Sequence, residues 1–341
     1  MRVELKLVNP LATYQSIIGD LFSVISMHTN YKNWLCSNIN QLVYFRDPEN
    51  REFSSMGFFY EHQSQEYQYM YFDIPLLETN KINYASLNVN ILEFIMSKIN
   101  DEYYIRLPIN MCNVKESDSD RMHMVFVHGY DDERKEVYIS NFHNGKKYAR
   151  HIYSFGEIEK GFRNRKDNVE EYLSDVIFFK LKKSKYPIWI DKIINELSAF
   201  LASCDIYQKY KYSIRWNKCQ IYYGEQYFDE LIYDLKLGCG DLRAIYVIYD
   251  FMKIIKKKAE ILVELNYLAE KSGEIIIEEI TGLIDEIWLI ILKYIYFVSK
   301  NPESHFMCNE EGKKIVSYHL LKVKQGIHQV IELLLDGLKP A

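Results

Sequence analysis

The chain has 341 residues, 48% of them hydrophobic and 26% charged, with a formal net charge of -5. This composition is typical of a soluble globular protein, and the small negative charge excludes a broadly basic surface for nucleic acid. A length well above the roughly 100–200 residues of a single domain predicts two domains.

No segment predicts export or insertion into a membrane. The first ten residues, MRVELKLVNP, alternate apolar and charged side chains and lack the apolar run of a signal peptide. The most apolar segment, 287–298, contains Lys293 and is shorter than the roughly 20 residues that span a bilayer, so it predicts a buried helix. The six cysteines form no CxxC pair, which argues against a zinc site or a disulfide framework. We expect a cytoplasmic protein without a metal or cofactor.

In chain order, the first half predicts α+β structure. A strand is expected at 3–8 and a helix at 13–27, and two short apolar-aromatic runs follow in QLVYFRD and MYFDIPLL. Further expected elements are a helix at 88–99, strands in EYYIRLPINM, MHMVFVHGYD and EVYISNF, a short helix in SFGEIEKGFRN, and a strand in SDVIFFKLK that could belong to either domain.

The second half predicts a helical bundle. Helical periodicity covers 187–201, 225–236, 241–268, 275–299 and 310–337. The charged segments RNRKDNVEEY and KLKKSKYP separate this half from the first. The expected domains are therefore residues 1–170 and residues 187–341.

The segment DRMHMVFVHGYDDERKEVYISNF, residues 120–142, contains the most informative residues. His123 begins an apolar strand, the strand ends at a tight turn, and the next strand leads to Asn141. Neighbouring antiparallel strands bring such residues about 5 Å apart, and a histidine held by an asparagine has the geometry of a general base. Simple packing of a strand histidine is the alternative.

This segment resembles the histidine hairpin of papain-like cysteine enzymes, particularly bacteriocin-processing peptidases and BtrH-like acyltransferases. The resemblance covers about residues 1–165 and rests on HMVFVHGYDDE, on VYISNF and on the order of the elements. It implies a papain-like domain in which His123 is the base and Asn141 orients it. His128, five residues along the strand, is expected on the opposite face.

In the family that the chain resembles, a cysteine opens an early helix. Here the start of the 13–27 helix offers Ala12 and Thr13, with Ser16 one turn later, and no cysteine. Three explanations remain open: an engineered change at Ala12, a hydroxyl nucleophile at Thr13 or Ser16, or a domain that binds an acyl or peptidyl chain without catalysis. The family's glutamine before the nucleophile is also missing, so an oxyanion hole would consist of backbone amides near residues 12–14, at the helix start.

The other candidate groups have structural interpretations. Cys36 follows the first helix and is expected to pack in the core, and the remaining cysteines are expected to behave as small buried hydrophobes. His143 and His151, with Asn144 and Gly145, are assigned to a hairpin turn and the strand beyond it. The segment KIIKKKAEI, 253–261, predicts a solvated basic helix face, or one that meets an acidic carrier protein.

The resemblance implies an acyltransferase or transglutaminase-like amide-forming enzyme of natural-product biosynthesis. It would move an acyl or peptidyl group from a carrier-protein thioester, through an enzyme thioester at a Cys-His-Asn type site, to an amine. The expected partners are an acyl or peptidyl carrier protein and an amine acceptor. The helical domain could act as a lid or as a docking surface for the carrier. A catalytically inactive binding or scaffold protein and a cysteine peptidase are the alternatives.

Overall fold

The protein divides into two compact units. The computed structural model describes residues 1–46, 54–59, 71–83, 86–87, 90–114, 122–142, 148–164, 173–204, 220–300 and 307–338. Unit 1 consists of residues 1–29 and 66–185, and unit 2 of residues 30–65 and 186–341. The sequence assigned 30–65 to the first domain, but in the structure the strand at 41–46 of this segment pairs with the strand at 220–223, which belongs to unit 2.

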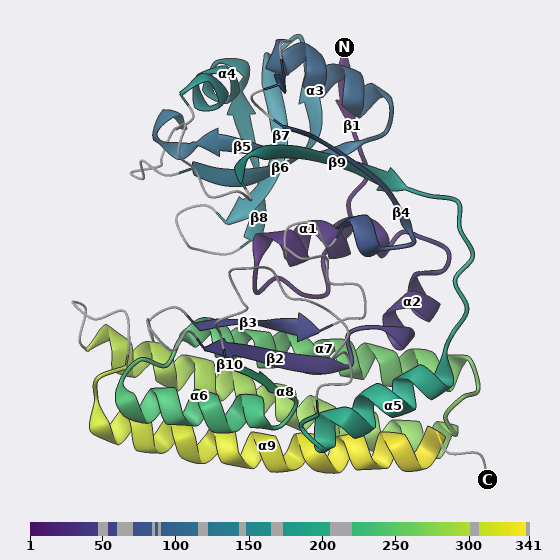
Figure 1. The fold of residues 1–341 in the computed structure, drawn as a ribbon, viewed down its shortest axis with the longest axis vertical. Helices are drawn as coiled ribbons and strands as arrows, with labels where there is room; N and C mark the ends of the chain where they lie inside the picture. The colour runs from purple at the N-terminus through teal and green to yellow at the C-terminus, as the bar shows by residue number, and fades with distance from the viewer. Residues whose placement is uncertain are drawn as a thin grey trace. The chain divides into compact units, whose positions relative to one another are not determined.

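Unit 1 is built on one antiparallel sheet (Figure 1). The strand order is β4-β9-β5-β6-β7-β8, and β1 pairs with the far end of β6. The bounds are Arg2–Glu4 for β1, Leu77–Asn83 for β4, Tyr104–Asn110 for β5, Met122–Asp131 for β6, Glu136–Phe142 for β7, Tyr148–Ser154 for β8 and Asp175–Leu181 for β9. The strand expected in SDVIFFKLK is thus β9, inside the sheet of unit 1. The run MYFDIPLL instead forms a short 3-10 turn at 71–73 before β4 begins.

The helices of unit 1 are α1 (Ser16–Ile25), α3 (Ile91–Asn100) and α4 (Phe155–Arg163), with a 3-10 turn, η3, at Met111–Asn113. Local capping explains two of the three starts. The Asn90 side chain accepts a hydrogen bond from Leu92 N, and Ser154 with Glu157 forms a reciprocal capping box. Both caps were readable from the sequence.

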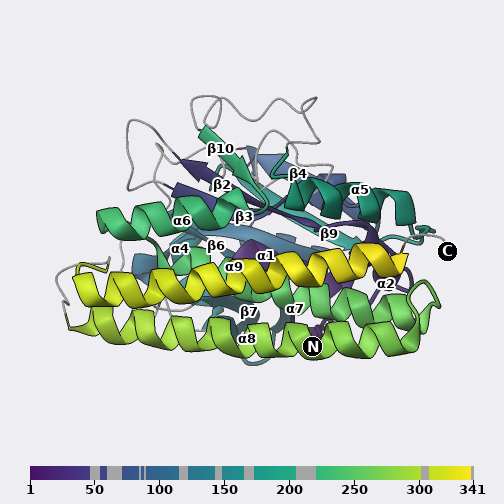
Figure 2. The same cartoon turned by 90° about the horizontal axis from the view of Figure 1, so that it is seen from below.

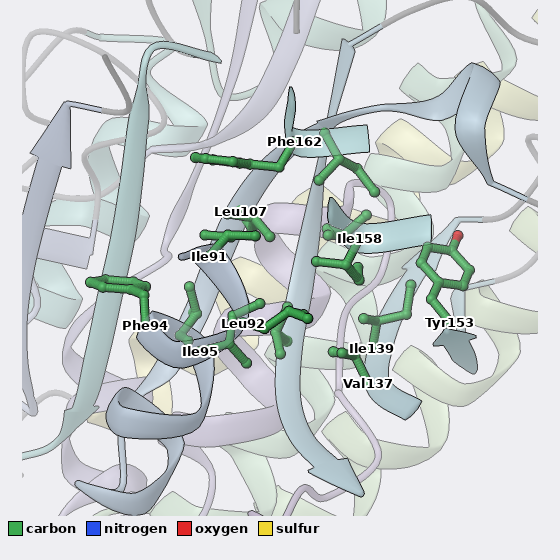
Figure 3. Packing of buried hydrophobic residues seen from close by; sticks show 14 of the residues in the cluster. Ile91, Leu92, Phe94, Ile95, Leu107, Val137, Ile139, Tyr153, Ile158 and Phe162 are labelled. Carbon is green, nitrogen blue, oxygen red and sulfur yellow. The ribbon is translucent and has the colours of Figure 1, made fainter. Parts of the chain in front are cut away.

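The core of unit 1 lies where α3 and α4 cover one face of the sheet (Figure 3). Alternate residues of β5, namely Ile105, Leu107 and Ile109, point into this core and are fully buried. Side chains alternate between the two faces of a strand, so Arg106 points to the other face. This alternation identifies the face on which each candidate residue lies.

Unit 2 combines a small sheet with a helical bundle. The sheet has the order β10-β2-β3, with bounds Gln220–Tyr223, Gln41–Arg46 and Ser54–Phe59, and β10 was not predicted. The helices are α2 (Tyr31–Ser37), α5 (Ile190–Leu201), α6 (Gln226–Leu237), α7 (Leu242–Glu264), α8 (Glu270–Ser299) and α9 (Glu310–Leu338). The three longest, α7, α8 and α9, run alongside one another (Figure 2).

The apolar segment 287–298 is buried on one face only. Ile287, Ile290, Ile291 and Tyr294 are buried, but Trp288 and Leu292 are 45% and 49% exposed. The prediction of a buried helix is therefore wrong for the outer face of α8. No helix in the described ranges is long and apolar enough to cross a membrane.

The basic segment 253–261 contains a buried lysine. The Lys258 ammonium donates hydrogen bonds to the carbonyl oxygen of Ile39 at 2.8 Å, to the carbonyl oxygen of Asn38 and to Oδ1 of Asn40. Burial lowers the pKa of Lys258 to about 7. The prediction of a solvated basic face is wrong at this position, because Lys258 is buried and its hydrogen bonds connect α7 to the turn after α2. Ile39 in that turn has the left-handed φ of 61°, which is rare for a β-branched residue.

Candidate functional site

The hairpin of β6 and β7 brings His123 and Asn141 together. His123 is the second residue of β6 and is half-buried, whereas Asn141, next to the end of β7, is fully buried. The His123 Nε2 atom lies 2.9 Å from Asn141 Oδ1. The sequence predicted that these two residues lie together, and in the structure they are in hydrogen-bond contact.

The backbone next to Asn141 determines which histidine nitrogen carries the proton. The Phe142 N–H donates to Asn141 Oδ1 at 2.7 Å. A backbone N–H can only donate, so this side-chain atom is the acceptor oxygen, and His123 Nε2 must donate to it. In the neutral ring the lone pair then belongs to Nδ1. This is the tautomer in which Nδ1 can remove a proton from a substrate group.

The amide nitrogen of Asn141 is a second notable feature of the pair. Asn141 Nδ2 is buried and has no hydrogen-bond partner within the described part of the chain. A buried donor without a partner costs free energy. Because the oxygen of this amide is hydrogen-bonded and its nitrogen is not, the oxygen determines the position of the Asn141 side chain. Two hydrogen bonds thus converge on one atom, Asn141 Oδ1.

His123 and Asn141 lie on the face of the sheet that α3 and α4 cover. His123 pairs directly with Ile109, which belongs to the core beneath these helices. Asn141 is two residues beyond Ile139, another member of the same core and labelled in Figure 3. Direct cross-strand partners, and residues two apart in a strand, share a face. The pair thus continues the core towards the end of the sheet.

Helix α1 lies on the opposite face. The Asp20 carboxylate accepts from Arg106 Nε at 3.0 Å and from the Tyr148 hydroxyl at 2.7 Å. Arg106 alternates with the core residues of β5, so α1 packs on the other side of the sheet. Burial raises the pKa of Asp20 to about 7, while the Arg106 guanidinium acts in the opposite direction.

The start of α1 nevertheless points towards the end of the sheet that holds the pair. Near the end of α1, Ser23 O accepts from Val8 N at 3.1 Å, in the segment that leaves β1, and β1 pairs with the last residues of β6. Closer to its start, Asp20 reaches Tyr148, the partner of Phe142 at the end of β7. The helix start and the pair share one end of the sheet, on different faces.

The helix begins three residues later than predicted. Its first residue is Ser16, preceded by Gln15 in an extended conformation without a side-chain cap. Ala12 is fully buried and Thr13 is half-buried, and both precede the first turn. Ala12 and Tyr14 are buried and extend the apolar pattern of α1 towards the N-terminus, but they are not helical. The helix was therefore predicted to start too early. The first residue whose amide could serve an oxyanion is consequently Ser16 rather than Ala12 or Thr13.

His128 lies on the face of α1. A β-bulge between Val127 and Gly129 interrupts the pairing of β6 with β7 at this residue. The His128 ring is 6.2 Å from the ring of Phe126, and burial lowers the pKa of His128 to about 4. His128 is therefore on the opposite face from His123, as expected, and it is neutral at pH 7.

Cys112 is an exposed thiol at the same end of the sheet. It follows β5, where its N–H donates to Asn110 Oδ1 at 3.0 Å, and Asn110 pairs with Met122, the residue before His123. The sequence treated Cys112 as a buried hydrophobe, which is wrong. Its place directly after a strand, beside the polar Asn110, was the available signal.

The other cysteines differ from one another. Cys36 is buried, as expected, and burial raises the pKa of its thiol to about 12. Cys204 and Cys308 are exposed and Cys239 is partly exposed, so the expectation of burial is wrong for them too. Cys219 lies outside the described residues.

The remaining sequence candidates form no further site. His151 is in β8 opposite Ile139, while His143, Asn144 and Gly145 lie outside the described residues. In the ranges that the structure covers, no group of three His, Cys, Asp or Glu side chains could hold a metal ion.

No protein-family model matches the chain, and no curated protein matches it. The geometry of the His123–Asn141 pair therefore defines the candidate site.

Proposed function

We propose that unit 1 transfers an acyl or peptidyl group from a carrier-protein thioester to an amine, with His123 as the general base. The observation that carries this proposal is the 2.9 Å contact between His123 Nε2 and Asn141 Oδ1. It assigns the proton to Nε2 and the lone pair to Nδ1, which is the form that accepts a proton from an attacking amine. The resemblance of the hairpin to the BtrH-like acyltransferases supports the choice of reaction.

We propose direct transfer without an enzyme thioester. The amine nitrogen bonds to the thioester carbonyl carbon, the C–S bond breaks, and His123 carries the amine proton to the departing thiolate. Direct transfer is supported by the residues at the start of α1, because Ala12 is buried and Ser16, the first helical residue, is not a thiol. A hydroxyl needs stronger activation than a thiol before it becomes a nucleophile.

The central experiment measures amide formation by mass spectrometry, with an acyl-loaded carrier protein and added amines. His123→Gln is expected to lower kcat/KM by at least about a hundredfold, the usual contribution of a general base. The matched control is His151→Gln, a change of the same chemistry on the same face of the sheet. Equal activity of the two variants would exclude His123 as the base.

Two further variants test the route. Direct transfer predicts that Cys112→Ser retains activity and that the wild-type protein acquires no acyl adduct. An acyl adduct on Cys112, with loss of activity in Cys112→Ser, would contradict direct transfer and assign the nucleophile to this thiol. Adducts that appear in Ala12→Cys or Thr13→Cys would instead show that the papain-like position remains accessible.

A non-catalytic binding module is the second candidate, and one observation favours it. The faces of the sheet separate the His123–Asn141 pair from α1, so a base and a helix start do not share one face. This candidate predicts that the acyl-loaded carrier protein binds unit 1 and that no amide forms. Release of free acid or of a cleaved peptide without an amine acceptor would indicate the third candidate, a peptidase.

A further inference from the structure

The outer face of α8 carries a continuous apolar surface, which we name the outer stripe. Its members are Trp288, Leu289, Leu292, Ile295 and Tyr296, each between 41% and 54% exposed. Their spacing of i, i+1, i+4, i+7 and i+8 places them on one side of the helix. A monomeric protein seldom exposes such a contiguous apolar surface, so the outer stripe indicates an interface.

Unpaired charges of opposite sign border the outer stripe. Asp285 precedes it and Lys300 follows it, and both are exposed. Lys300 Nζ lies 4.4 Å above the ring of Tyr296. Neither Asp285 nor Lys300 forms an ion pair with any described residue. The helix is thus acidic at one end of the stripe and basic at the other.

Leu292 is the centre of this pattern. Asp285 is seven residues before Leu292 and Lys300 is eight residues after it, while Trp288 and Tyr296 are each four residues away. Turning α8 end to end about Leu292 therefore exchanges the acidic border with the basic one and one aromatic ring with the other. A surface that complements itself in this way fits a two-fold symmetric contact, in which the same patch meets itself.

We propose that a second copy of this chain covers the outer stripe, with the two α8 helices antiparallel across a two-fold axis at Leu292. Asp285 then faces Lys300 of the partner copy, and Trp288 packs beside Tyr296 of the partner copy. A parallel arrangement would instead place equal charges together. The occupant is a second copy because the complementary charges and rings are all present on this one helix.

Side chains of α9 widen the contact. His319 Nε2 lies 2.6 Å from Lys293 Nζ, so this part of α9 lies beside Lys293, the residue that follows Leu292 of the stripe. On α9, Tyr318 and Leu321 are 55% and 46% exposed. A contact built from one helix and a few flanking residues belongs to the small, weak class of interfaces. The dimer is expected to form in a concentration-dependent manner.

Sedimentation velocity of the full chain from about 1 µM to about 1 mM tests the proposal. The wild-type protein is expected to shift from monomer to dimer across this range. Leu292→Glu places a charge at the two-fold axis and is expected to raise the dissociation constant at least thirtyfold, roughly the effect of losing a central anchor. The matched control is Ile275→Glu, because Ile275 is 49% exposed on the same helix but lies outside the contact.

A charge exchange tests the antiparallel arrangement. Lys300→Glu and Asp285→Lys are each expected to weaken the dimer, since each creates two like-charge contacts across the axis. The double variant restores two opposite-charge contacts and is expected to restore the dimer. A protein that stays monomeric at about 1 mM, or a dimer equally affected by Leu292→Glu and Ile275→Glu, overturns the proposal. Failure of the double variant to recover overturns the antiparallel arrangement.

Discussion

The Asn141 side chain shows how one buried acceptor can set the chemistry of a neighbouring histidine. Asn141 Oδ1 accepts both from the Phe142 backbone and from His123 Nε2. Because the backbone N–H fixes the orientation of the amide, the histidine has no choice of tautomer. The neutral tautomer of His123 is thus set by the protein before any ligand binds.

This dependence can be measured without an activity assay. In the wild-type protein, nitrogen NMR of the neutral His123 ring is expected to show a proton on Nε2 alone. Asn141→Ala removes the acceptor, so the two neutral tautomers are expected to exchange. Ser140→Ala, on the neighbouring residue of β7, is the control and should leave the spectrum unchanged. A single Nε2–H tautomer in Asn141→Ala would refute the role assigned to Asn141.

Lys258 should make the stability of unit 2 depend on pH. Its pKa is about 7 in the folded protein and near 10.4 in an unfolded chain, because burial penalises the charged amine. Between these values the unfolded state binds more protons, so the free energy of unfolding should rise with pH, by at most about 1.4 kcal/mol per pH unit. Below pH 7 the penalty is fully present.

Urea unfolding at several pH values from 7 to 10 checks this sign. Lys258→Met is expected to remove the contribution of this amine to the slope. Lys257→Met is the control, since the Lys257 side chain is 44% exposed and pairs with Glu260. If both variants retain the wild-type slope, Lys258 does not titrate in this window.

At the scale of elements, α1 packs closely against Tyr148 of β8 because residue 19 is a glycine. A Cβ on Gly19 would lie 3.0 Å from two ring atoms of Tyr148, whose hydroxyl donates to Asp20. Adding that methyl group would displace the ring and strain its hydrogen bond to the buried carboxylate. The absence of a side chain at position 19 therefore sets the distance between α1 and β8.

Gly19→Ala is expected to lower the free energy of unfolding of unit 1 by about 1–2 kcal/mol, despite the better helix propensity of alanine. Gly156→Ala is the matched control within unit 1. An added Cβ at Gly156 in α4 meets nothing within 4 Å, so this change should be neutral or stabilising by up to about 1 kcal/mol. Thermal unfolding of both variants measures the difference, and a stabilised Gly19→Ala protein would contradict the close approach.

The elements that the sequence predicted best carry their own local signals. Asn90 caps α3, the Ser154–Glu157 box starts α4, and continuous apolar runs mark β6 and β7. The start of α1 lacks a cap, and the buried residues Ala12 and Tyr14 extend the apolar pattern beyond the helix start although neither is helical. A local sequence pattern predicts the start of a helix correctly only where a capping residue ends the pattern.

The candidate site was predictable in part. Spacing along the hairpin is enough to bring His123 close to Asn141. Which helices cover the two faces of the sheet depends on contacts between residues far apart in the sequence, such as the contact of Asp20 with Arg106 that holds α1 on the opposite face. The burial of Lys258 and the exposure of Cys112 were not predicted for the same reason. Periodicity identifies a face of a helix or strand but not the element that covers that face.

At the scale of the whole molecule, the segment 30–65 belongs with a partner more than 120 residues away. Its strand β2 pairs with β10, and the Tyr44 hydroxyl donates to Asp234 at 2.6 Å. Leu42 and Tyr44 are fully buried in unit 2. A fragment that begins at residue 186 therefore lacks part of its own core.

We expect the fragment 186–341 to unfold with low cooperativity, because its bundle lacks the apolar side chains of β2 and the partners of Lys258. Joining residues 30–65 to residues 186–341 by a flexible linker is expected to restore a cooperative transition. Circular dichroism during urea unfolding of the two proteins makes the comparison. Equal cooperativity without residues 30–65 would show that this segment is dispensable to unit 2.

The same arrangement has a consequence for synthesis on the ribosome. Strand β2 is made early, but β10 and the helices that bury Leu42 and Tyr44 emerge about 180 residues later, roughly ten to forty seconds at ordinary rates of translation. During that interval β2 is not yet paired with β10. The side chains of β2 that are buried in the folded protein are not yet covered by the helices of unit 2. Unit 1 can finish folding at residue 185, so unit 2, whose segment begins at residue 30, is the last to be completed.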